Sequence, residues 1–458
     1  MTTSGPSEDH PPAGGSYVTT IRSDVLVLGS TLGGLVAANY LARAGLRVVL
    51  LEEEVHAKRP TLLRDPFMLS GLASGGPVMR VLRELALPLI EQREIQRSDV
   101  ALQVILPAAR IDVVRGQDAL AREIEAHGLG NAKALKAWLA AVDAQAARTQ
   151  ADLWEDATRP RGRGIGRLLA DEDTVHMSAE PGLPPAPKGL DGFIHAQLAA
   201  LSALESTARV PAPALLLHMT REGAFSMPHA DTPFLELFRR RLAELHGEIR
   251  PLGSFSLVLD RTDVGLELPR GRLFGRALVI AVPREPLRRF LMKSGPAPAW
   301  LKRSSQPQQT SSRIFRAERR TLPQGMAERV IRADGRSPQE LHWFVRRPDP
   351  EDQKIEWLVF FGPGTRDLPG HHPLGQLAPF SAPGIVPVDP GPTPDWDLDA
   401  SGLRFPDPFI PASVRQRPPV VTVGPELAPG LGFEGELLAA RRVALRLAER
   451  LGARRRVL

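Results

Sequence analysis

A glycine-rich turn near the N-terminus is the first part of this sequence whose residue types and spacing point to chemistry. Its six consecutive residues are Gly29, Ser30, Thr31, Leu32, Gly33 and Gly34. In a turn of this kind, backbone N–H groups and the dipole of the following helix hold a pyrophosphate. An acidic residue about twenty positions further on accepts a hydrogen bond from a ribose hydroxyl. Glu52, followed by Glu53, stands at that distance. The pattern predicts a dinucleotide-binding site.

The segments around this turn predict the strand–helix–strand unit that such a site requires. Residues 24–28 and 47–51 are short apolar runs rich in Val and Leu, typical of buried strands. Residues 35–44 have helical spacing, and Gly45 ends that helix. A unit without a ligand is the alternative, because Thr31 stands where a glycine normally lets the backbone approach the pyrophosphate. Its hydroxyl would either bind a phosphate or block it.

A second glycine-rich segment lies near the C-terminus. Residues 420–423 read as a strand, and residues 434–451 read as a long helix.

Both segments resemble FAD-dependent oxidoreductases of the phytoene desaturase and amine oxidase type. Segment 423–435 resembles the closing motif of that family, which lies along the ribityl chain and the isoalloxazine. The resemblance implies that the helix over residues 434–451 directs its N-terminal amides at the cofactor. It also implies that the cofactor is bound by Gly424, Pro425, Gly430, Leu431, Gly432 and Phe433. The resemblance implies that Phe255 holds the adenine through its backbone. It also places Lys58 and Arg59 where the family usually has a Gly-Gly-Arg segment. Residues 277–283 resemble the family strand that ends in Ala-x-Pro.

The resemblance implies FAD as the cofactor and hydride removal from a substrate held against the flavin. It leans toward desaturases and so implies an apolar, isoprenoid-like small molecule. It identifies no catalytic residue. A flavin-free, non-catalytic binding or scaffold protein with the same fold is the alternative, because Thr31, Pro425 and segment 58–60 depart from the family pattern. A nicotinamide-binding oxidoreductase would leave the C-terminal segment without a purpose.

We therefore expect an α/β protein with a Rossmann-like FAD-binding lobe, built on a parallel sheet with helices, and a mixed α+β substrate lobe. The first residues, 1–20, are polar and rich in Gly, Pro and Ser, which predicts a disordered tail. The FAD-binding lobe would comprise residues 21–60, 215–285 and 415–458. The substrate lobe would comprise residues 61–214 and 286–414.

Within these lobes, several elements are predicted from periodicity. Residues 100–106 and 109–114 form a predicted hairpin, and residues 117–145 a single helix. The apolar segment 67–90 predicts either an ordinary core helix or an entrance for an apolar substrate that touches a membrane. Arg239–Arg241 lies in a helix-like stretch, where a solvated face is expected.

The composition limits the classes of binding partner that are expected. The net charge of +6 is small for 458 residues and its basic residues are scattered, so no nucleic-acid partner is expected. The absence of cysteine excludes disulfides and thiolate ligands. With no apolar leader, a cytoplasmic location is expected, with peripheral contact at the inner face of a membrane as an extension. No metal site is predicted, because His371–His372 and the acidic run 395–399 lack further ligands.

Overall fold

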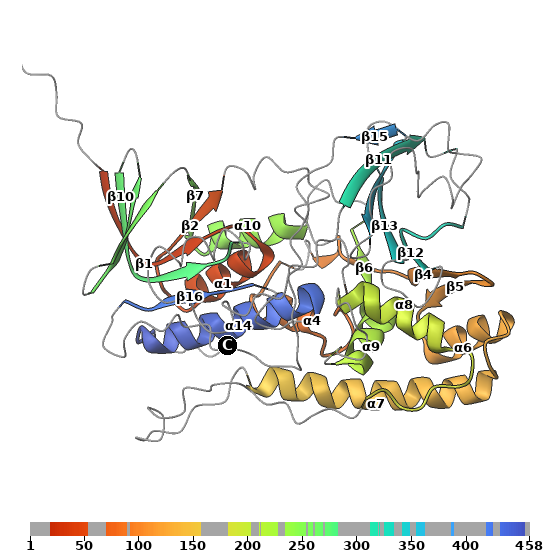
Figure 1. The fold of residues 1–458 in the computed structure, drawn as a ribbon. Helices are drawn as coiled ribbons and strands as arrows, with labels where there is room; N and C mark the ends of the chain where they lie inside the picture. Colours follow the sequence, from red (N-terminus) through yellow and green to blue (C-terminus); the bar gives the residue numbers. More distant parts are fainter. Residues whose placement is uncertain are drawn as a thin grey trace, which may run out of the picture.

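The computed structural model places two sheets side by side, each with its own helices (Figure 1). It describes residues 19–53, 70–88, 92–156, 182–202, 210, 212–227, 234–252, 255–259, 262–268, 271–282, 312–318, 320, 325–333, 341–348, 354–361, 386–388, 418–424 and 431–453.

The first sheet carries the glycine-rich turn. Its strand order is β7-β2-β1-β10-β9-β8, and β16 pairs with β10. The pairs β7·β2, β2·β1, β1·β10 and β10·β16 are parallel, whereas β8 and β9 form antiparallel pairs next to β10. The strands are β1 (Thr19–Leu28), β2 (Val48–Glu53), β7 (Glu248–Leu252), β8 (Ser256–Leu259), β9 (Val264–Leu268), β10 (Gly271–Ile280) and β16 (Val420–Thr422).

Apolar side chains of β1 are buried on both faces of this sheet. Val25 and Val27 join the core cluster under the helices, whereas Leu26 and Leu28 join a separate apolar cluster on the opposite face. Successive side chains of a strand point to opposite faces, so a continuous apolar run indicates a sheet covered on both sides.

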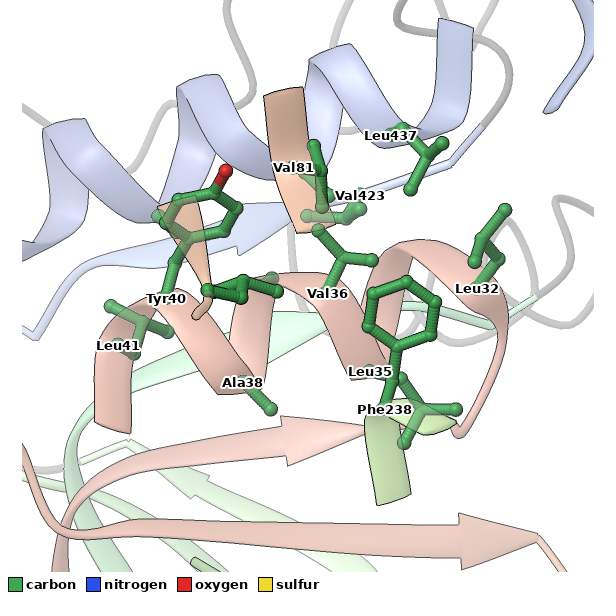
Figure 2. Packing of buried hydrophobic residues seen from close by; sticks show 14 of the residues in the cluster. Leu32, Leu35, Val36, Ala38, Tyr40, Leu41, Val81, Phe238, Val423 and Leu437 are labelled. Carbon is green, nitrogen blue, oxygen red and sulfur yellow. The ribbon is translucent and has the colours of Figure 1, made fainter. Parts of the chain in front are cut away.

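Helix α1 (Leu32–Arg43) fills the layer between this sheet and α14 (Gly432–Arg450). Figure 2 shows Leu35 beside Phe238 of α10 (Phe234–Glu244) and Val36 directed toward Val423. Residues 32–42 of α1 are all buried, because other elements cover the helix on every side. Small residues along the helix allow this close packing.

The second sheet has the order β15-β11-β14-β13-β12-β4-β5, with one parallel pair, β12·β4. A separate two-stranded sheet joins β3 (Gln96–Arg97) to β6 (Phe225–Ser226). The strands of the second sheet are β4 (Val100–Leu106), β5 (Ala109–Val114), β11 (Ser312–Glu318), β12 (Arg329–Ala333), β13 (Leu341–Pro348), β14 (Lys354–Phe361) and β15 (Val386–Val388). Its helices are α6 (Gln117–Ala126), α7 (Ala132–Asp156), α8 (Asp191–Ser202) and α9 (Pro213–Gly223).

The two sheets confirm the expected α/β class and the hairpin over residues 100–114. The single helix predicted over residues 117–145 is wrong, because α6 and α7 are separate helices. Gly128 and Gly130 adopt φ values of +73° and +135° between them. Such backbone conformations end a right-handed helix.

The apolar segment over residues 67–90 contains α4 (Pro77–Glu84), whose apolar face belongs to the core. Val78, Val81, Leu82 and Leu85 are at most 3% exposed and pack in the same cluster as α1. Among the described residues, this confirms the core-helix interpretation. None of the described helices combines the length and apolar character needed to cross a bilayer.

Trp154 at the end of α7 connects the two groups of helices. Its ring lies between the guanidinium groups of Arg80, at 4.9 Å, and Arg441, at 3.9 Å. Arg441 also donates to both carboxylate oxygens of Glu84, at 2.7 and 2.9 Å. A stacked and bidentate guanidinium is held in one orientation, so this contact fixes α7 against α4 and α14.

Replacing Phe238 tests the packing between α10 and α1. The side chain is fully buried and makes an edge-to-face contact with Phe234, with ring centroids 5.3 Å apart. We expect Phe238→Ala to lower the free energy of unfolding by about 3–5 kcal/mol, because the cavity lies in a tightly packed layer. Urea denaturation measures the loss. The control Val258→Ala, at a side chain 36% exposed, should change stability by less than about 0.5 kcal/mol.

Candidate dinucleotide site

The glycine-rich turn brings β1, β10 and α1 into direct backbone contact. A Cβ atom on Gly29 would lie 2.2 Å from the Ala281 carbonyl oxygen, and one on Gly34 would lie 2.3 Å from the Gly29 carbonyl oxygen. Gly29 also has a φ of +105°, which favours glycine. The first and last glycines of the motif are therefore required by packing.

The turn leaves three successive N–H groups at the positive end of α1. In the part of the chain that the structure describes, the N–H groups of Ser30, Thr31 and Leu32 have no hydrogen-bond acceptor. Ser30 and Leu32 are only 1% and 4% exposed. Buried N–H groups at a helix N-terminus favour an anion.

Thr31 caps the helix. Its hydroxyl accepts from the Gly34 N–H at 3.3 Å and donates to the Ala281 carbonyl at 3.2 Å. The departure from glycine at this position therefore has a structural reason, since threonine is a favourable N-cap residue. Its side chain binds protein atoms.

Glu52 lies at the end of β2, beside the turn. Its carboxylate accepts a hydrogen bond from the Ser30 hydroxyl at 2.9 Å and pairs with the Arg239 guanidinium. The side chains of Glu52 and Arg239 are 16% and 18% exposed. The expectation of a solvated face over Arg239–Arg241 is therefore wrong for Arg239, and also for Arg241, which donates to the Leu85 carbonyl. No local pattern predicts this contact, because its two residues lie 187 positions apart in the sequence.

Glu436 contacts the turn from the other side. Its Oε1 atom accepts from the Gly33 N–H at 2.7 Å, and its side chain is buried in α14. Burial raises the pKa of the Glu436 carboxyl, although hydrogen bonds from Gly33 and Thr31 oppose that shift. Sequence analysis missed this residue. The only sequence feature that could have indicated it is its position as an acid among small and apolar residues of a predicted helix.

Glu434 ties the same helix to another segment. Its Oε1 atom accepts from the Ser70 N–H at 3.0 Å and from the Ser70 hydroxyl at 2.5 Å. Burial raises the pKa of this carboxyl, and the Ser70 hydrogen bonds oppose the shift. Glu434 therefore anchors the first turn of α14, which begins at Gly432.

The remaining predicted site residues are placed only in part. Glu53 ends β2, Phe255 directly precedes β8, and the buried Gly424 lies two residues after the end of β16. Leu431 is the buried N-cap of α14, followed by Gly432 and by the partly buried Phe433. The other four lie outside the described residues: Lys58, Arg59, Pro425 and Gly430.

These positions fit a dinucleotide at the turn with one conflict. The N–H groups of residues 30–32 and the Glu52 carboxylate suit a pyrophosphate and a ribose. Gly33, the next N–H donor, is already bonded to a carboxylate of the chain itself. An anion that used this donor as well would have to displace Glu436.

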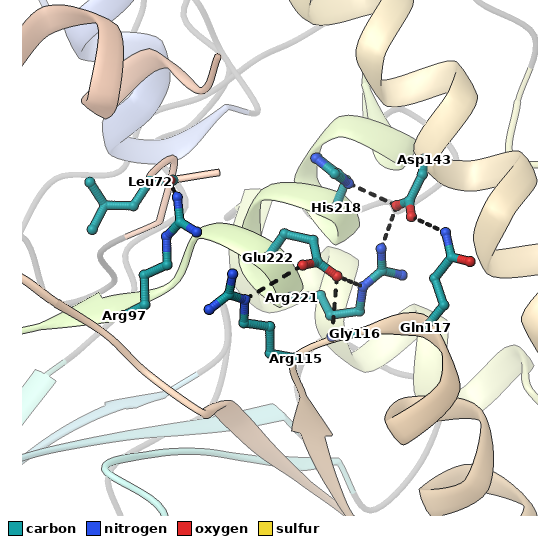
Figure 3. A network of polar contacts seen from close by, with 9 residues as sticks. All are labelled: Leu72, Arg97, Arg115, Gly116, Gln117, Asp143, His218, Arg221 and Glu222. Atoms are coloured by element: carbon teal, nitrogen blue, oxygen red, sulfur yellow. Dashed lines mark hydrogen bonds and ion pairs between the residues drawn. The ribbon is translucent and has the colours of Figure 1, made fainter. Parts of the chain in front are cut away.

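A second polar cluster ties α6, α7 and α9 together (Figure 3). Asp143 of α7 accepts from Gln117 at 2.5 Å, contacts His218 Nδ1 at 2.7 Å and pairs with the buried Arg221. Burial alone would raise the pKa of Asp143, but hydrogen bonds from His218 and Gln117, with the Arg221 charge, lower it to about 2. Arg221 also binds Glu222 at 2.8 Å. The cluster therefore holds α6, α7 and α9 together.

Comparison with known proteins places the fold. The chain matches no protein-family model and no curated protein sequence. Among solved structures, it is similar to a putrescine oxidase variant with redesigned cofactor binding, at 14% identity and a TM-score of 0.52, covering 94% of this chain and 100% of that one. An oxidoreductase from Methanosarcina mazei is 13% identical with a TM-score of 0.53, covering 92% and 99%.

A third similar structure is the PF1083 protein from Pyrococcus furiosus, at 13% identity and a TM-score of 0.54, covering 94% of this chain and 98% of that one. The described elements and these full-length matches show that the chain shares the fold of this putrescine oxidase variant and of the Methanosarcina mazei oxidoreductase. At such low identity, the similarity concerns the fold alone.

Replacing Gly34 tests the close packing at the turn. We expect Gly34→Ala to destabilise the protein by about 3 kcal/mol or more, because the new methyl group would meet the backbone at Gly29. Thermal unfolding followed by circular dichroism measures the change. The matched control is Gly192→Ala, where an added Cβ meets nothing within 4 Å. An equal effect of both substitutions would contradict the packing argument.

Replacing Asp143 tests the electrostatic cluster. Its pKa is lowered from 3.8 to about 2, so its stabilising contribution is present above pH 3.8 and is lost as the pH falls through 2. Asp143→Asn should lose roughly 1–2 kcal/mol at pH 7, after allowance for solvent screening. Urea unfolding at several pH values should show this difference shrinking below pH 4. The control is Asp152→Asn, which alters an exposed acid of the same helix α7.

Proposed function

We propose that this chain is an FAD-dependent oxidoreductase. The observation that carries the proposal is the combination of three successive N–H groups, at residues 30–32, that have no acceptor among the described residues, with Glu52 at the end of the neighbouring strand. A pyrophosphate and a ribose present complementary acceptors and donors at that spacing. The fold supports this proposal because flavin-dependent amine oxidases share it.

The residues of this chain would bind and orient the cofactor. Ser30, Thr31 and Leu32 would hold the pyrophosphate through their N–H groups, and Glu52 would accept from the ribose. Arg239 pairs with the Glu52 carboxylate and orients it. The first turn of α14 would face the flavin end, where Glu434 fixes the helix start. When bound, the flavin supplies a hydride acceptor for the substrate.

The chemical class of the substrate is a separate part of this proposal. An apolar, isoprenoid-like molecule stays a prediction from sequence resemblance, and so does peripheral contact with a membrane. The described part of the proposed apolar entrance, α4, packs into the core. Putrescine oxidase, named for a small amine, has the same fold. Both apolar molecules and amines therefore belong in a first substrate screen.

A flavin-free relative is the second candidate, and one specific observation favours it. Glu436 already bonds to a donor of the α1 N-terminus, so that the chain satisfies part of the site internally. Such a protein would use the fold for binding or as a scaffold. The two candidates differ in whether flavin stays with the purified protein.

Absorption spectroscopy with a variant at Glu52 tests the function. The purified protein, incubated with FAD and passed through gel filtration, should keep flavin absorbance between about 300 and 550 nm. Glu52→Gln should weaken FAD binding about tenfold, because a charged acceptor for the ribose is lost. The exposed Glu449→Gln variant is the control. A colourless wild type that also fails to bind added FAD would favour the flavin-free candidate.

A further inference from the structure

The Glu436 side chain has the properties of an internal ligand for the N-terminus of α1. Its Oε1 atom lies 2.7 Å from the Gly33 nitrogen, which is 403 residues away in the sequence. The residue is 6% exposed, so the carboxyl lies away from solvent. An acid at this position does what a bound anion does at a helix N-terminus, since both accept hydrogen bonds from the same backbone groups.

The surroundings hold this carboxyl tightly. A Cβ atom built on Gly33 would lie 2.9 Å from Glu436 Oε1 and 2.6 Å from Val423 Cγ1. The glycine at this position therefore makes room both for the acid and for Val423, the residue that follows β16.

Glu434 differs from Glu436 in its partner. Both acids lie in the first two turns of α14 and both are buried, but Glu434 bonds to Ser70, outside the glycine-rich turn. Only Glu436, among the described acidic residues, bonds to an N–H group of that turn. Competition with a pyrophosphate is therefore expected from this residue alone.

We propose that Glu436 closes the dinucleotide site as an internal anion, and that its carboxyl must leave the Gly33 N–H before a pyrophosphate can bind there as well as at residues 30–32. The inference rests on the proposed function, because it assumes a dinucleotide at this turn. In this proposal, the Glu436 side chain lowers the affinity of the protein for the cofactor. The Glu436 carboxyl satisfies the Gly33 N–H, and cofactor binding is weakened by the cost of displacing this side chain.

Three variants test the proposal. Glu436→Ala removes the carboxyl, Glu436→Gln keeps the shape and an acceptor for Gly33 but removes the charge, and Glu449→Ala alters an exposed acid of the same helix. Flavin fluorescence titration with FAD measures affinity. We expect Glu436→Ala to bind FAD at least about tenfold more tightly than the wild type, with Glu436→Gln between them. The Glu449→Ala variant should match the wild type.

A second probe separates this inference from the proposed function. Inorganic pyrophosphate, at millimolar concentration, should raise the melting temperature of Glu436→Ala and leave that of the wild type unchanged. If pyrophosphate stabilises the variant while FAD binds neither protein, Glu436 does close an anion site and the FAD proposal fails. If the wild type and Glu436→Ala bind FAD equally, the FAD proposal stands and the role of Glu436 is overturned.

The folded state of the variants is checked by circular dichroism. If Glu436→Ala does not fold, the measurement on Glu436→Gln decides, because glutamine can still accept from the Gly33 N–H. A folded Glu436→Gln whose FAD affinity and response to pyrophosphate equal those of the wild type would overturn the proposal. Tighter FAD binding or a pyrophosphate-dependent rise in melting temperature would support it.

Discussion

The close approach of backbones at the glycine-rich turn is the constraint on which the rest of this structure depends. Gly29 lies against the Ala281 carbonyl and Gly34 against the Gly29 carbonyl, so β1, β10 and α1 meet with no space for a side chain. Helix α1 is thereby held against the sheet, and α14 covers its other side. Two glycines near the N-terminus thus determine where a helix packs that lies about 400 residues later.

This packing buries backbone N–H groups at the N-terminus of α1, and side chains of the protein accept hydrogen bonds from some of them. A buried helix N-terminus leaves N–H groups without intrahelical acceptors. Thr31 satisfies Gly34, and Glu436 satisfies Gly33, while Ser30 and Leu32 present their N–H groups to the candidate site. The departure at Thr31, which raised the alternative of a blocked site, is therefore a helix cap. The residue that would compete with a bound pyrophosphate is therefore Glu436, and not Thr31.

Buried charged side chains are likewise satisfied by residues from distant parts of the chain. Arg239 meets Glu52, Arg441 meets Glu84, and Arg221 meets Asp143, each between elements that are distant in sequence. Charges removed from water must be paired and hydrogen-bonded. Many arginines of this chain consequently hold helices in place, and the small positive net charge says little about partners. The Trp154 contact with Arg441 extends this arrangement between the two groups of helices.

The sequence by itself determined the local elements of the first lobe. The apolar runs at residues 24–28 and 47–51, the helix between them and the long C-terminal helix all follow from periodicity and glycine placement, because these signals act within one segment. The break between α6 and α7 escaped prediction, since glycine costs little enough inside a helix to be tolerated there. The candidate positions at the turn and Glu52 were also found in this way. Their role in cofactor binding, and the division into lobes, stay predictions.

Only the tertiary structure decided which side chains surround the turn. Arg239 and Glu436 come from helices 187 and 403 residues away from their partners, and no local pattern encodes such a meeting. The same holds for Ser70 with Glu434 and for Trp154 between two arginines. Pairings of this kind depend on how the layers stack, which is set by the whole chain burying its apolar surface at once.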